Sequence, residues 1–478
     1  MSKTFCIAPW HDTHIVTDGG FKGCCVMAAG PTKGRFTKDG KHVTIKEGLG
    51  AGINSDTAKE LRLSLMNGKW HPECKRCMDE EKAGMKSMRN FYDERWGERF
   101  THEDAVAITD AETGELPEDH VPFFYDIQLG NLCNLKCRIC SPQSSSAWLP
   151  DHQKMMAHES SWRERLTKGR EIVLYEHKGG KQFQMTPDPY AWANSDEFWE
   201  QMSARKDKIE HLYLIGGEPM MIQRHFKFLK ECVESGDSKH IVLQYDTNLT
   251  NLPAKVMEYW SEFKTIEIGF SIDGMGKELE YMRNPIKWDH MLKNIHKVEE
   301  FAKNNSNVKL TDSVTVSIYN VLHILDYIEW KVKAGYYDFE YLWQRHGQHF
   351  GIHPLHSPHY LSVKIMPDSA KKSITEKYLE WEKKMHSWID TIGEHYSNIQ
   401  TSENLKEHIS IYVKTWVDFI NDVDKSIHMY EFWQFTNDLD KIRDEKFADV
   451  FPELSELLLD YTEKPDWWFL PTEKFTKE

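Results

Sequence analysis

The sequence predicts an α/β fold built around a parallel sheet. Between residues about 120 and 365, short apolar runs alternate with runs at helical spacing, as parallel strands joined by right-handed crossovers require. Five or six such units fit a partial (β/α)6 TIM-like barrel. Cysteines gather before this region, and apolar residues at helical spacing follow it. We therefore predict a small cysteine-rich domain with a linker over 1–115, a partial barrel over 116–365 and a helical region over 366–478.

Composition narrows the class of protein. The 478 residues suffice for two or three domains, and 40% hydrophobic and 12% aromatic residues indicate a globular chain. The formal charge of −15 without a long basic run argues against nucleic acid as a partner. The N-terminus has no apolar signal region and no stretch is long enough to span a membrane, so we expect a cytoplasmic protein with reduced cysteines.

Three cysteines follow the first predicted strand of the barrel. The apolar run 123–129 ends in a turn at Gly130, and Cys133, Cys137 and Cys140 follow with the spacing C-x3-C-x2-C. Three thiolates on one loop can hold three irons of a cubane cluster and leave the fourth iron open, as a catalytic centre needs. A zinc site, with a fourth ligand such as His152, is the alternative.

The N-terminal segment carries a second set of cysteines. Cys6, Gly19 and Cys24 are spaced C-x12-G-x4-C, and Cys74 and Cys77 form a C-x2-C pair. Four thiolates suit either zinc or an iron–sulfur cluster. Cys25 is adjacent to Cys24, so only one of the two is expected to be a ligand, and the glycine spacing favours Cys24.

Polar groups follow the later strands of the predicted barrel, where barrels and open parallel sheets carry their chemistry. The predicted strands are 211–215, 241–245, 265–270, 313–318 and a late strand near 350–355. The polar groups after them include Glu218, Thr247, Asn248, Ser271, Asp273 and Asn320. Gly216 and Gly217 allow close approach of backbone to a ligand, and Glu218 can accept from an ammonium. Each Asn or Asp also has an ordinary role as a strand terminator.

The cysteine triplet after a strand, with Gly216, Gly217, Glu218 and Pro219 after the next strand, resembles the radical SAM superfamily of enzymes. The resemblance implies a [4Fe–4S] cluster on Cys133, Cys137 and Cys140, with S-adenosylmethionine chelated to the open iron. It also implies cofactor-binding roles for further residues: Ile139, Gly216, Gly217, Glu218, Pro219, Thr247, Asn248, Ser271, Asp273, and Val316 or Ile318. Among these, the Gly-Gly-Glu-Pro motif binds the methionine amino group, Ser271 and Asp273 lie near ribose and carboxylate, and Val316 or Ile318 packs on adenine. Ile139 departs from the family, which commonly has an aromatic residue there.

The activity implied by the resemblance is reductive cleavage of S-adenosylmethionine to a 5′-deoxyadenosyl radical that abstracts hydrogen from a substrate. It implies an electron donor such as flavodoxin or ferredoxin. The N-terminal spacing resembles SPASM and Twitch domains, which carry auxiliary [4Fe–4S] clusters but usually follow the core. The short cysteine complement suits the one-cluster Twitch form, on Cys6, Cys24, Cys74 and Cys77. A peptide or protein substrate is our first expectation, with a small molecule, RNA or a zinc-stabilised non-catalytic interaction protein as alternatives.

Several further elements are predicted outside the motifs. We expect a charged helix over 78–99, a linker over 101–122, and an insertion over about 141–208 with its own helices, one over 196–203. Helices are also predicted over 225–233, 253–263, 288–303 and 322–334. Cys232 lies in the first of these and is expected to be a buried residue and no ligand. Beyond 366, apolar spacing predicts three or more amphipathic helices.

Overall fold

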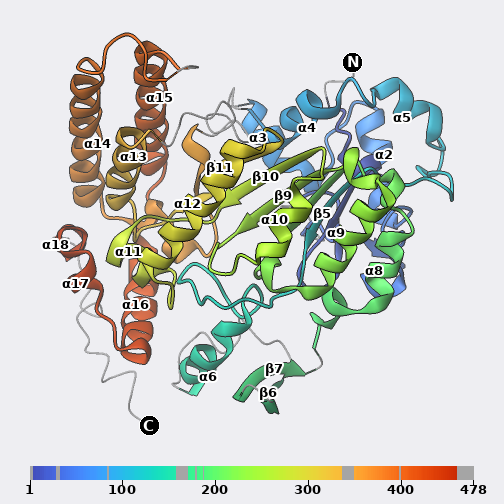
Figure 1. Cartoon of the computed structure of the whole chain (residues 1–478), viewed down its shortest axis with the longest axis horizontal. Coiled ribbons are helices and arrows are strands. Elements are labelled where there is room, and N and C mark those ends of the chain that lie inside the picture. The colour runs from blue at the N-terminus through green and yellow to red at the C-terminus, as the bar shows by residue number, and fades with distance from the viewer. Residues whose placement is uncertain are drawn as a thin grey trace.

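The computed structural model describes residues 4–27, 33–82, 86–157, 171–177, 180–186, 188–335, 349–397 and 400–459. A seven-stranded sheet lies at its centre, in the order β11-β10-β9-β8-β5-β1-β2 (Figure 1). Its strands are β1 Asp12–Ile15, β2 Phe21–Lys22, β5 Phe124–Gln128, β8 His211–Ile215, β9 Val242–Thr247, β10 Thr265–Phe270 and β11 Val308–Asp312. All neighbouring pairs from β11 to β1 are parallel, and only β2 is antiparallel. The predicted α/β class with a parallel sheet is therefore confirmed.

The strands that follow in the barrel segment are separate from this sheet. β12 (Val314–Val316) and β13 (Ile352–Pro354) pair in parallel as a two-stranded sheet of their own. They coincide with the predicted runs 313–318 and 350–355. β11 itself was not predicted, because its sequence VKLTD alternates apolar and polar residues too briefly to stand out. Closure of these strands into a six-unit partial barrel stays a prediction.

Helices occur throughout the described chain, and in its central segment they alternate with the strands. They are α1 Ala8–His11, α2 Asp56–Met66, α3 Lys75–Lys82, α4 Met88–Trp96, α5 His102–Ile108, α6 Leu149–Ala157, α8 Asp196–Ser203, α9 Gln223–Ser235, α10 Ala254–Trp260, α11 Gly276–Met282, α12 Trp288–Asn304, α13 His323–Lys333, α14 Asp368–Ile389, α15 Ser402–Asn421, α16 Met429–Arg443, α17 Phe447–Val450 and α18 Pro452–Leu459. The predicted helices of the barrel segment match α8, α9, α10, α12 and α13 within a few residues. None of the helices that the structure describes is long and apolar enough to cross a bilayer.

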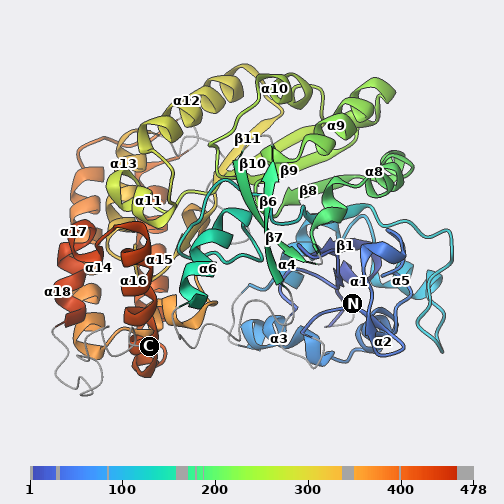
Figure 2. The ribbon, with the colours of Figure 1, turned by 90° about the horizontal axis from the view of Figure 1, so that it is seen from below.

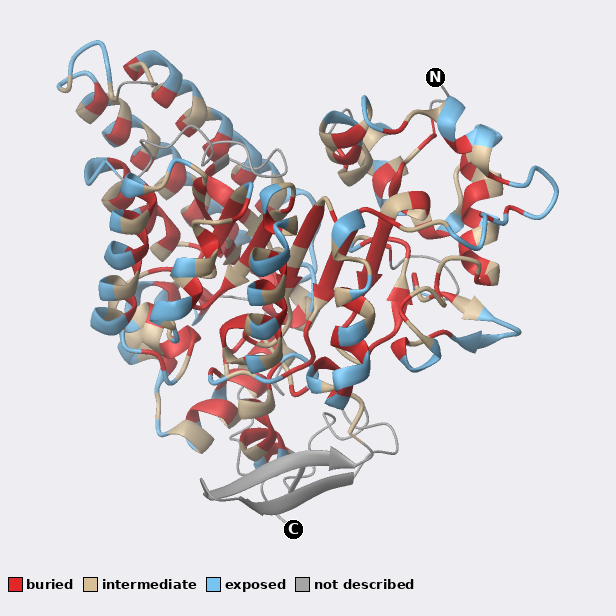
Figure 3. Ribbon diagram, turned by 45° about the vertical axis from the view of Figure 1, so that its right-hand side comes forward, coloured by how far each residue is buried: buried red, intermediate tan, exposed pale blue. Residues whose placement is uncertain are grey.

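Helices α9, α10 and α12 lie along one face of the sheet, and α4 lies on the other (Figures 1 and 2). The strand side chains Leu212, Leu214, Leu243 and Tyr245 are fully buried. Alternate positions of the same strands carry polar groups, because successive side chains point to opposite faces. Buried residues concentrate on the strands and on the inward sides of the helices, and exposed residues lie outside (Figure 3).

The polar groups form a row across the sheet. His14, Asp126, Tyr213, Gln244 and Glu267 lie in lateral register on five adjacent strands. His14 Nδ1 is 2.7 Å from Asp126 Oδ2, and both side chains are almost fully buried. One face of the parallel sheet is therefore polar, although both faces of a parallel sheet are covered and usually apolar.

Helix α4 packs on the polar face and joins the N-terminal segment to the sheet. Arg95 Nη2 donates to Glu267 Oε1 at 2.8 Å, and Tyr92 Oη donates to Asp12 Oδ2 at 2.5 Å. The Trp96 ring lies 4.8 Å from the ring of Phe124. Together with β1, this helix makes the N-terminal segment part of the central sheet and its cover. The division at residue 115 into separate domains stays a prediction.

Two predictions for the segment before the barrel were wrong. The helix expected over 78–99 is two helices, because Ser87 begins α4 with a capping box in which Ser87 Oγ accepts from Asn90 N and Asn90 accepts from Ser87 N. The expected linker contains α5, which Thr101 and Asp104 cap in the same way.

The insertion after the cysteine loop has helices of its own, α6 and α8, as predicted. It also contains an antiparallel pair that was not predicted, β6 Glu171–His177 and β7 Gly180–Thr186. Two short strands of the N-terminal segment, β3 Thr37–Lys38 and β4 Lys41–His42, form a further pair.

The C-terminal region is helical, as predicted. α14 and α15 pack side by side at one end of the molecule (Figure 1), and their buried faces carry Tyr378, Trp381, Ile409 and Trp416. These apolar and aromatic residues lie in a packed core, which the spacing at three and four residues predicts. α16 departs from this pair and reaches the cysteine loop of the barrel segment.

Candidate functional site

The cysteine loop and the Gly-Gly turn pack against each other at the carboxyl ends of β5 and β8. Gly217 N donates to Gly130 O at 3.1 Å, and Glu218 N donates to Leu132 O at 2.8 Å. A Cβ atom added at Gly217 would lie 2.3 Å from Leu132 O, and Gly216 has φ +124°. Only glycine permits this approach of the two backbones. The adjacent parallel strands β5 and β8 thus bring the two motifs together, although they are far apart in the sequence.

Glu218 is a buried carboxylate with three donors from the protein. Its oxygens accept from Met220 N at 3.0 Å, Thr247 Oγ1 at 2.7 Å and Asn248 N at 2.8 Å. The residue is 1% exposed, and burial raises its pKa to about 6 in spite of these hydrogen bonds. The donors hold the carboxylate in one orientation at the end of the strand.

Asn248 connects Glu218 with the cysteine loop. Its backbone N–H donates to Glu218, and its side-chain Nδ2 lies 3.8 Å from Cys133 Sγ and 3.2 Å from Asn134 Oδ1. Thr247 ends β9 and Asn248 directly follows it, so three adjacent strands contribute to one group of side chains. These residues were predicted to lie together, and the structure brings them together.

Asp273 forms a buried ion pair that also reaches the cysteines. Arg283 Nε donates to Asp273 Oδ2 at 2.8 Å, and its Nη1 lies 3.9 Å from Cys137 Sγ. Asp273 Oδ1 accepts from Thr315 N at 2.9 Å. Burial acts to lower the pKa of Arg283, but the charge of Asp273 raises it above its ordinary value. Arg283 directly follows α11 and was not singled out in the sequence, since nothing in its neighbourhood of the chain marks it.

The three thiols of the loop are shielded to different degrees, with Cys137 buried and Cys133 and Cys140 half-buried. A hydrogen bond between Cys137 and Cys140 lowers the pKa of Cys137 and raises that of Cys140. Burial raises the pKa of Cys133 to about 12. Leu135 N lies 3.4 Å from Cys133 Sγ as a donor. The loop thus presents its sulfur atoms beside one amide, Asn248, and one guanidinium, Arg283.

The remaining residues predicted for the cofactor site surround this group less directly. Ser271 N donates to Thr247 O at 2.9 Å, which places Ser271 at the end of β10 beside the end of β9. Val316 and Ile318 are fully buried, and Val316 belongs to the β12–β13 pair. Pro219 begins a buried turn, and Ile139 is half-buried in the cysteine loop. Contact of these residues with a nucleoside stays a prediction.

Helix α16 holds the cysteine loop from the opposite side. Arg138, between Cys137 and Ile139, is fully buried, and its Nη2 donates to Asp440 Oδ1 at 2.5 Å and Glu445 Oε2 at 2.6 Å. Its guanidinium carbon lies 3.5 Å from the centre of the Tyr281 ring. The sequence analysis missed this contact, because Arg138 and Asp440 are separated by 302 positions.

A second arginine ties the same helix to the loop. Arg443 Nε donates to Asp151 Oδ2 at 2.8 Å, and its Nη2 donates to Lys136 O at 2.7 Å. Trp148 lies under this guanidinium at 4.9 Å and donates its Nε1–H to Cys137 O at 2.8 Å. The C-terminal region, for which the sequence predicted amphipathic helices, therefore fixes the backbone of the cysteine loop.

The N-terminal cysteines gather in a separate place. Cys6, Cys24, Cys74 and Cys77 line one small cavity. Burial raises the pKa of Cys74 to about 12, and the side chains of the other three are also largely shielded. Cys25 is exposed and does not line this cavity. Cys232 is fully buried in α9, as the sequence predicted.

Comparisons with known proteins give a likeness of fold. No family model matches the chain, and no curated protein sequence matches it. Among solved structures, native anSMEcpe with bound AdoMet is 14% identical with a TM-score of 0.31, over 70% of this chain and 98% of that chain. SuiB of Streptococcus suis is 13% identical with a TM-score of 0.29, over 62% of this chain and 55% of that chain. A histidine-tagged form of anSMEcpe with bound AdoMet is 16% identical with a TM-score of 0.30, over 55% of this chain and 59% of that chain. At these TM-scores the likeness carries no functional assignment.

Proposed function

We propose that this protein is a radical SAM enzyme. The arrangement of Glu218, Asn248 and Cys133 carries the proposal, because Asn248 touches both the carboxylate and the sulfur. Three motif elements that the family resemblance relates to one cofactor thus lie within a few hydrogen bonds of one another. Separate structural roles would not require the glutamate and the cysteine loop to share a partner.

The donor set of the loop fits an iron–sulfur cluster better than a single zinc ion. A tetrahedral zinc ion with Zn–S bonds of about 2.3 Å holds its sulfur ligands roughly 3.8 Å apart. Among the residues that the structure describes, the one set of three His, Cys, Asp or Glu side chains with all ligand atoms within 4.8 Å of one another contains no cysteine. In each cysteine set at least one sulfur atom therefore lies farther from the others than this limit, although Cys137 and Cys140 are close enough to form a hydrogen bond, and a cubane cluster accommodates sulfur ligands that are farther apart than those of one zinc ion. Cys133, Cys137 and Cys140 would hold the [4Fe–4S] cluster of the active site.

The residues around the thiols have roles in holding the cofactor. Glu218, fixed by Thr247 and Asn248, would accept from the ammonium group of S-adenosylmethionine. Arg283 places a positive charge beside Cys137 and neutralises Asp273 in the protein interior. Ser271, Val316 and Ile318 would contact the nucleoside.

The chemistry follows from the cofactors that this site would hold. A cluster held by Cys133, Cys137 and Cys140 would supply the one-electron reduction of S-adenosylmethionine, with the electron from a donor such as flavodoxin or ferredoxin. Breakage of the C–S bond would give methionine and a 5′-deoxyadenosyl radical, which would take a hydrogen atom from the substrate. The protein would position the cofactor and keep water away from it. The buried carboxylates of Glu218 and Asp273 contribute to both, because they are fixed in place and shielded from solvent.

We further propose that Cys6, Cys24, Cys74 and Cys77 hold an auxiliary [4Fe–4S] cluster in a Twitch-like site. Tyr92 lines this cavity and donates to Asp12 of β1, next to β5 in the sheet. The cavity thus adjoins the polar face of the central sheet. The carboxyl end of the same sheet carries the loop with Cys133, Cys137 and Cys140. The proposed auxiliary cluster and the proposed active-site cluster would therefore be connected through the central sheet, although the cysteine-rich segment precedes the barrel in the sequence.

A peptide or protein is the substrate class that we propose. The Twitch-like cysteine spacing supports this proposal, because enzymes that carry such domains often modify peptides. Each candidate peptide is tested by measuring 5′-deoxyadenosine with and without the peptide. A substrate should raise the amount above the slow formation that occurs in its absence. Deuterium from a labelled peptide must appear in that product, and a small molecule that transfers deuterium where peptides do not would contradict the choice.

Anaerobic reconstitution tests the enzyme itself. We expect about eight irons per loaded chain, and 5′-deoxyadenosine when dithionite and S-adenosylmethionine are added. Cys137→Ala should abolish the product, whereas Cys232→Ala, which removes a thiol buried in α9, should retain it. Absence of 5′-deoxyadenosine from fully iron-loaded, reduced protein would count against the proposal, and two zinc ions without labile sulfide would support a non-catalytic protein.

A further inference from the structure

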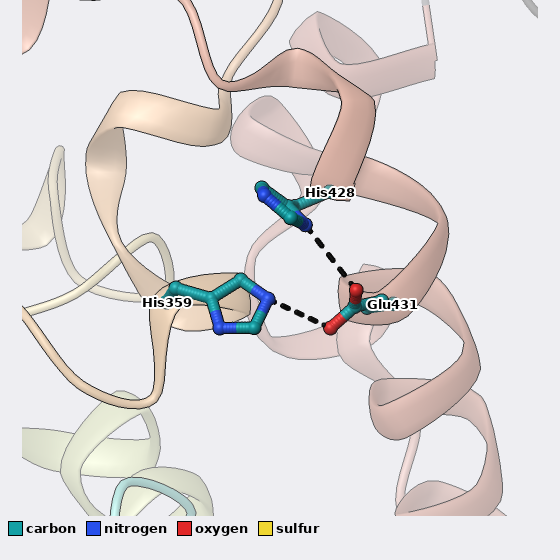
Figure 4. A group of neighbouring side chains, drawn as sticks. All are labelled: His359, His428 and Glu431. Atoms are coloured by element: carbon teal, nitrogen blue, oxygen red, sulfur yellow. Dashed lines mark hydrogen bonds and ion pairs between the residues drawn. The ribbon is translucent and has the colours of Figure 1, made fainter. Parts of the chain in front are cut away.

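Two histidines and a glutamate converge at the start of helix α16, outside both sets of cysteines. His359 belongs to the 3-10 turn His359–Leu361, while His428 immediately precedes α16 and Glu431 lies in its first turn. His359 Nε2 lies 2.9 Å from Glu431 Oε2, and His428 Nδ1 lies 3.2 Å from Glu431 Oε1. Figure 4 shows the two imidazoles directed at the two oxygens of one carboxylate.

The fold brings these groups together from two segments of the chain. His428 and Glu431 are three residues apart, so they share one face of the helix start. His359 comes from a turn that packs against α16, and the rings of His359 and His428 lie 4.2 Å apart. The three side chains are 38%, 34% and 26% exposed for His359, His428 and Glu431, so they are partly shielded and still reachable from solvent.

The donor set is selective for a class of metal ion. Imidazole nitrogens and one carboxylate suit zinc and related first-row transition metals, whereas calcium and magnesium prefer oxygen ligands. The three ligand atoms all lie within 4.8 Å of one another. A tetrahedral zinc ion with bonds of about 2.0–2.1 Å needs ligand atoms roughly 3.4 Å apart. Small rotations of the three partly exposed side chains would reach this spacing.

We propose that His359, His428 and Glu431 bind a divalent transition metal ion of the zinc class, with water in the fourth position. A hydrogen bond joins His428 to Glu431, whereas the contact of His359 with the same carboxylate is an ion pair. A metal ion placed between the three groups would take one ligand atom from each of them. The site is distinct from the cysteine sites in both ligand type and place.

The proposed metal would anchor the helix that holds the cysteine loop. Phe435 follows Glu431 by four residues on α16, and its ring lies 5.2 Å from Tyr360, the neighbour of His359. The same ring lies 6.2 Å from Trp148, which donates to Cys137 O. A metal ion that joins the turn at His359 to the start of α16 therefore closes a chain of contacts behind the cysteine loop. We assign it a structural role.

Zinc content and zinc spectroscopy of the cluster-loaded protein test the site. The chain is used without a polyhistidine tag, which binds the same metals, and is equilibrated with Zn2+ and then freed of loose metal. We expect one zinc per chain more in the wild type than in His428→Gln or His359→Gln. His356→Gln is the matched control, because His356 is an exposed histidine three residues before His359 and outside the group.

X-ray absorption at the zinc edge separates this site from zinc bound by stray thiols. We expect a first shell of nitrogen and oxygen at about 2.0–2.1 Å and no sulfur shell near 2.3 Å. Equal zinc content in the wild type and both histidine variants, or a sulfur shell, would overturn the proposal and leave a hydrogen-bonded cluster only. The variants are compared by circular dichroism, and Glu431→Gln must also lose the zinc. None of these readouts depends on S-adenosylmethionine chemistry, so they stand apart from the test of the proposed function.

Discussion

Glu218 is the residue at which burial, hydrogen bonding and proposed chemistry meet. Three donors orient its carboxylate, yet its pKa is raised to about 6 because the protein interior disfavours the charge. A bound ammonium would supply the missing positive charge. The sequence marked Glu218 by its place in the Gly-Gly-Glu-Pro motif, but its donors Thr247 and Asn248 became its partners only through the pairing of β8 with β9.

Glu218→Gln should weaken the binding of S-adenosylmethionine by roughly 10-fold or more, since a hydrogen bond to a charged group contributes about 1.5–3 kcal/mol. In the wild type we expect affinity to fall as the pH is lowered through about 6, where Glu218 takes up a proton. Equilibrium dialysis of the cluster-loaded protein at several pH values measures both effects. Glu234→Gln, on the exposed side of α9, is the control and should bind as the wild type does.

The same carboxyl group contributes to stability with the opposite trend. Its pKa is raised from 4.5 to about 6 in the folded protein, so protonation favours the folded state. This stabilisation is complete below about pH 4.5 and is lost as the pH rises through about 6, and it amounts to about 2 kcal/mol. Denaturant unfolding of the wild type should therefore lose about this much relative to Glu218→Gln between acidic and neutral pH. An unchanged difference would contradict the burial of a titrating carboxyl.

At the scale of elements, helix α16 is the feature that the sequence analysis undervalued. Its apolar spacing predicted an amphipathic helix, and Phe432, Phe435 and Leu439 are indeed buried. Its last turn, however, supplies Asp440 and Arg443 to the cysteine loop, and Glu445 follows shortly after. A cation such as Arg443 in the last turn of a helix is ordinarily explained by the helix dipole, so nothing local in the sequence marks it as a partner of the cysteine loop.

Arg443→Ala should loosen the cysteine loop without unfolding α16, because it removes donors to Asp151 and Lys136 O. After reconstitution we expect the site at Cys133, Cys137 and Cys140 to retain about half or less of the iron that it retains in the wild type. We also expect faster amide hydrogen exchange in residues 133–140. Lys441→Ala is the matched control: it removes a cation from the same helix turn, but Lys441 is exposed. Equal iron retention in the two variants would show that the arginine contacts do not position the loop.

At the scale of the whole molecule, the N-terminal segment is an edge of the central sheet. β1 pairs with β5 along four residues, and α4 covers the polar face through Arg95 and Trp96. Its composition predicted a cysteine-rich segment in front of a barrel, and β1, with the sequence DTHI, carries no strand signal of its own. The partner strand supplies the hydrogen bonds that make this segment a strand.

A chain that lacks residues 1–115 should be insoluble or lack a cooperative thermal transition. Removal of residues 1–115 exposes the hydrogen-bonding edge of β5. It also leaves Glu267 without its partner Arg95 and Phe124 without its neighbour Trp96. The solubility and the thermal unfolding of the fragment measure the effect. Co-expression of residues 1–115 as a separate chain should restore both the solubility and the cooperative transition. A soluble fragment with a wild-type unfolding temperature would establish the two segments as independent domains.

The sequence by itself determined the α/β class, most strands of the barrel segment, the amphipathic C-terminal helices and the two sets of cysteines. These depend on local patterns: apolar runs of strand length, helical periodicity and the spacing of cysteines within a loop. Only the tertiary structure decided that β1 joins the sheet, that Arg283 lies beside Cys137, and that His359 meets His428 and Glu431. Each of these contacts joins residues that are distant in the sequence, and their formation depends on strand pairing and helix packing that no local pattern encodes.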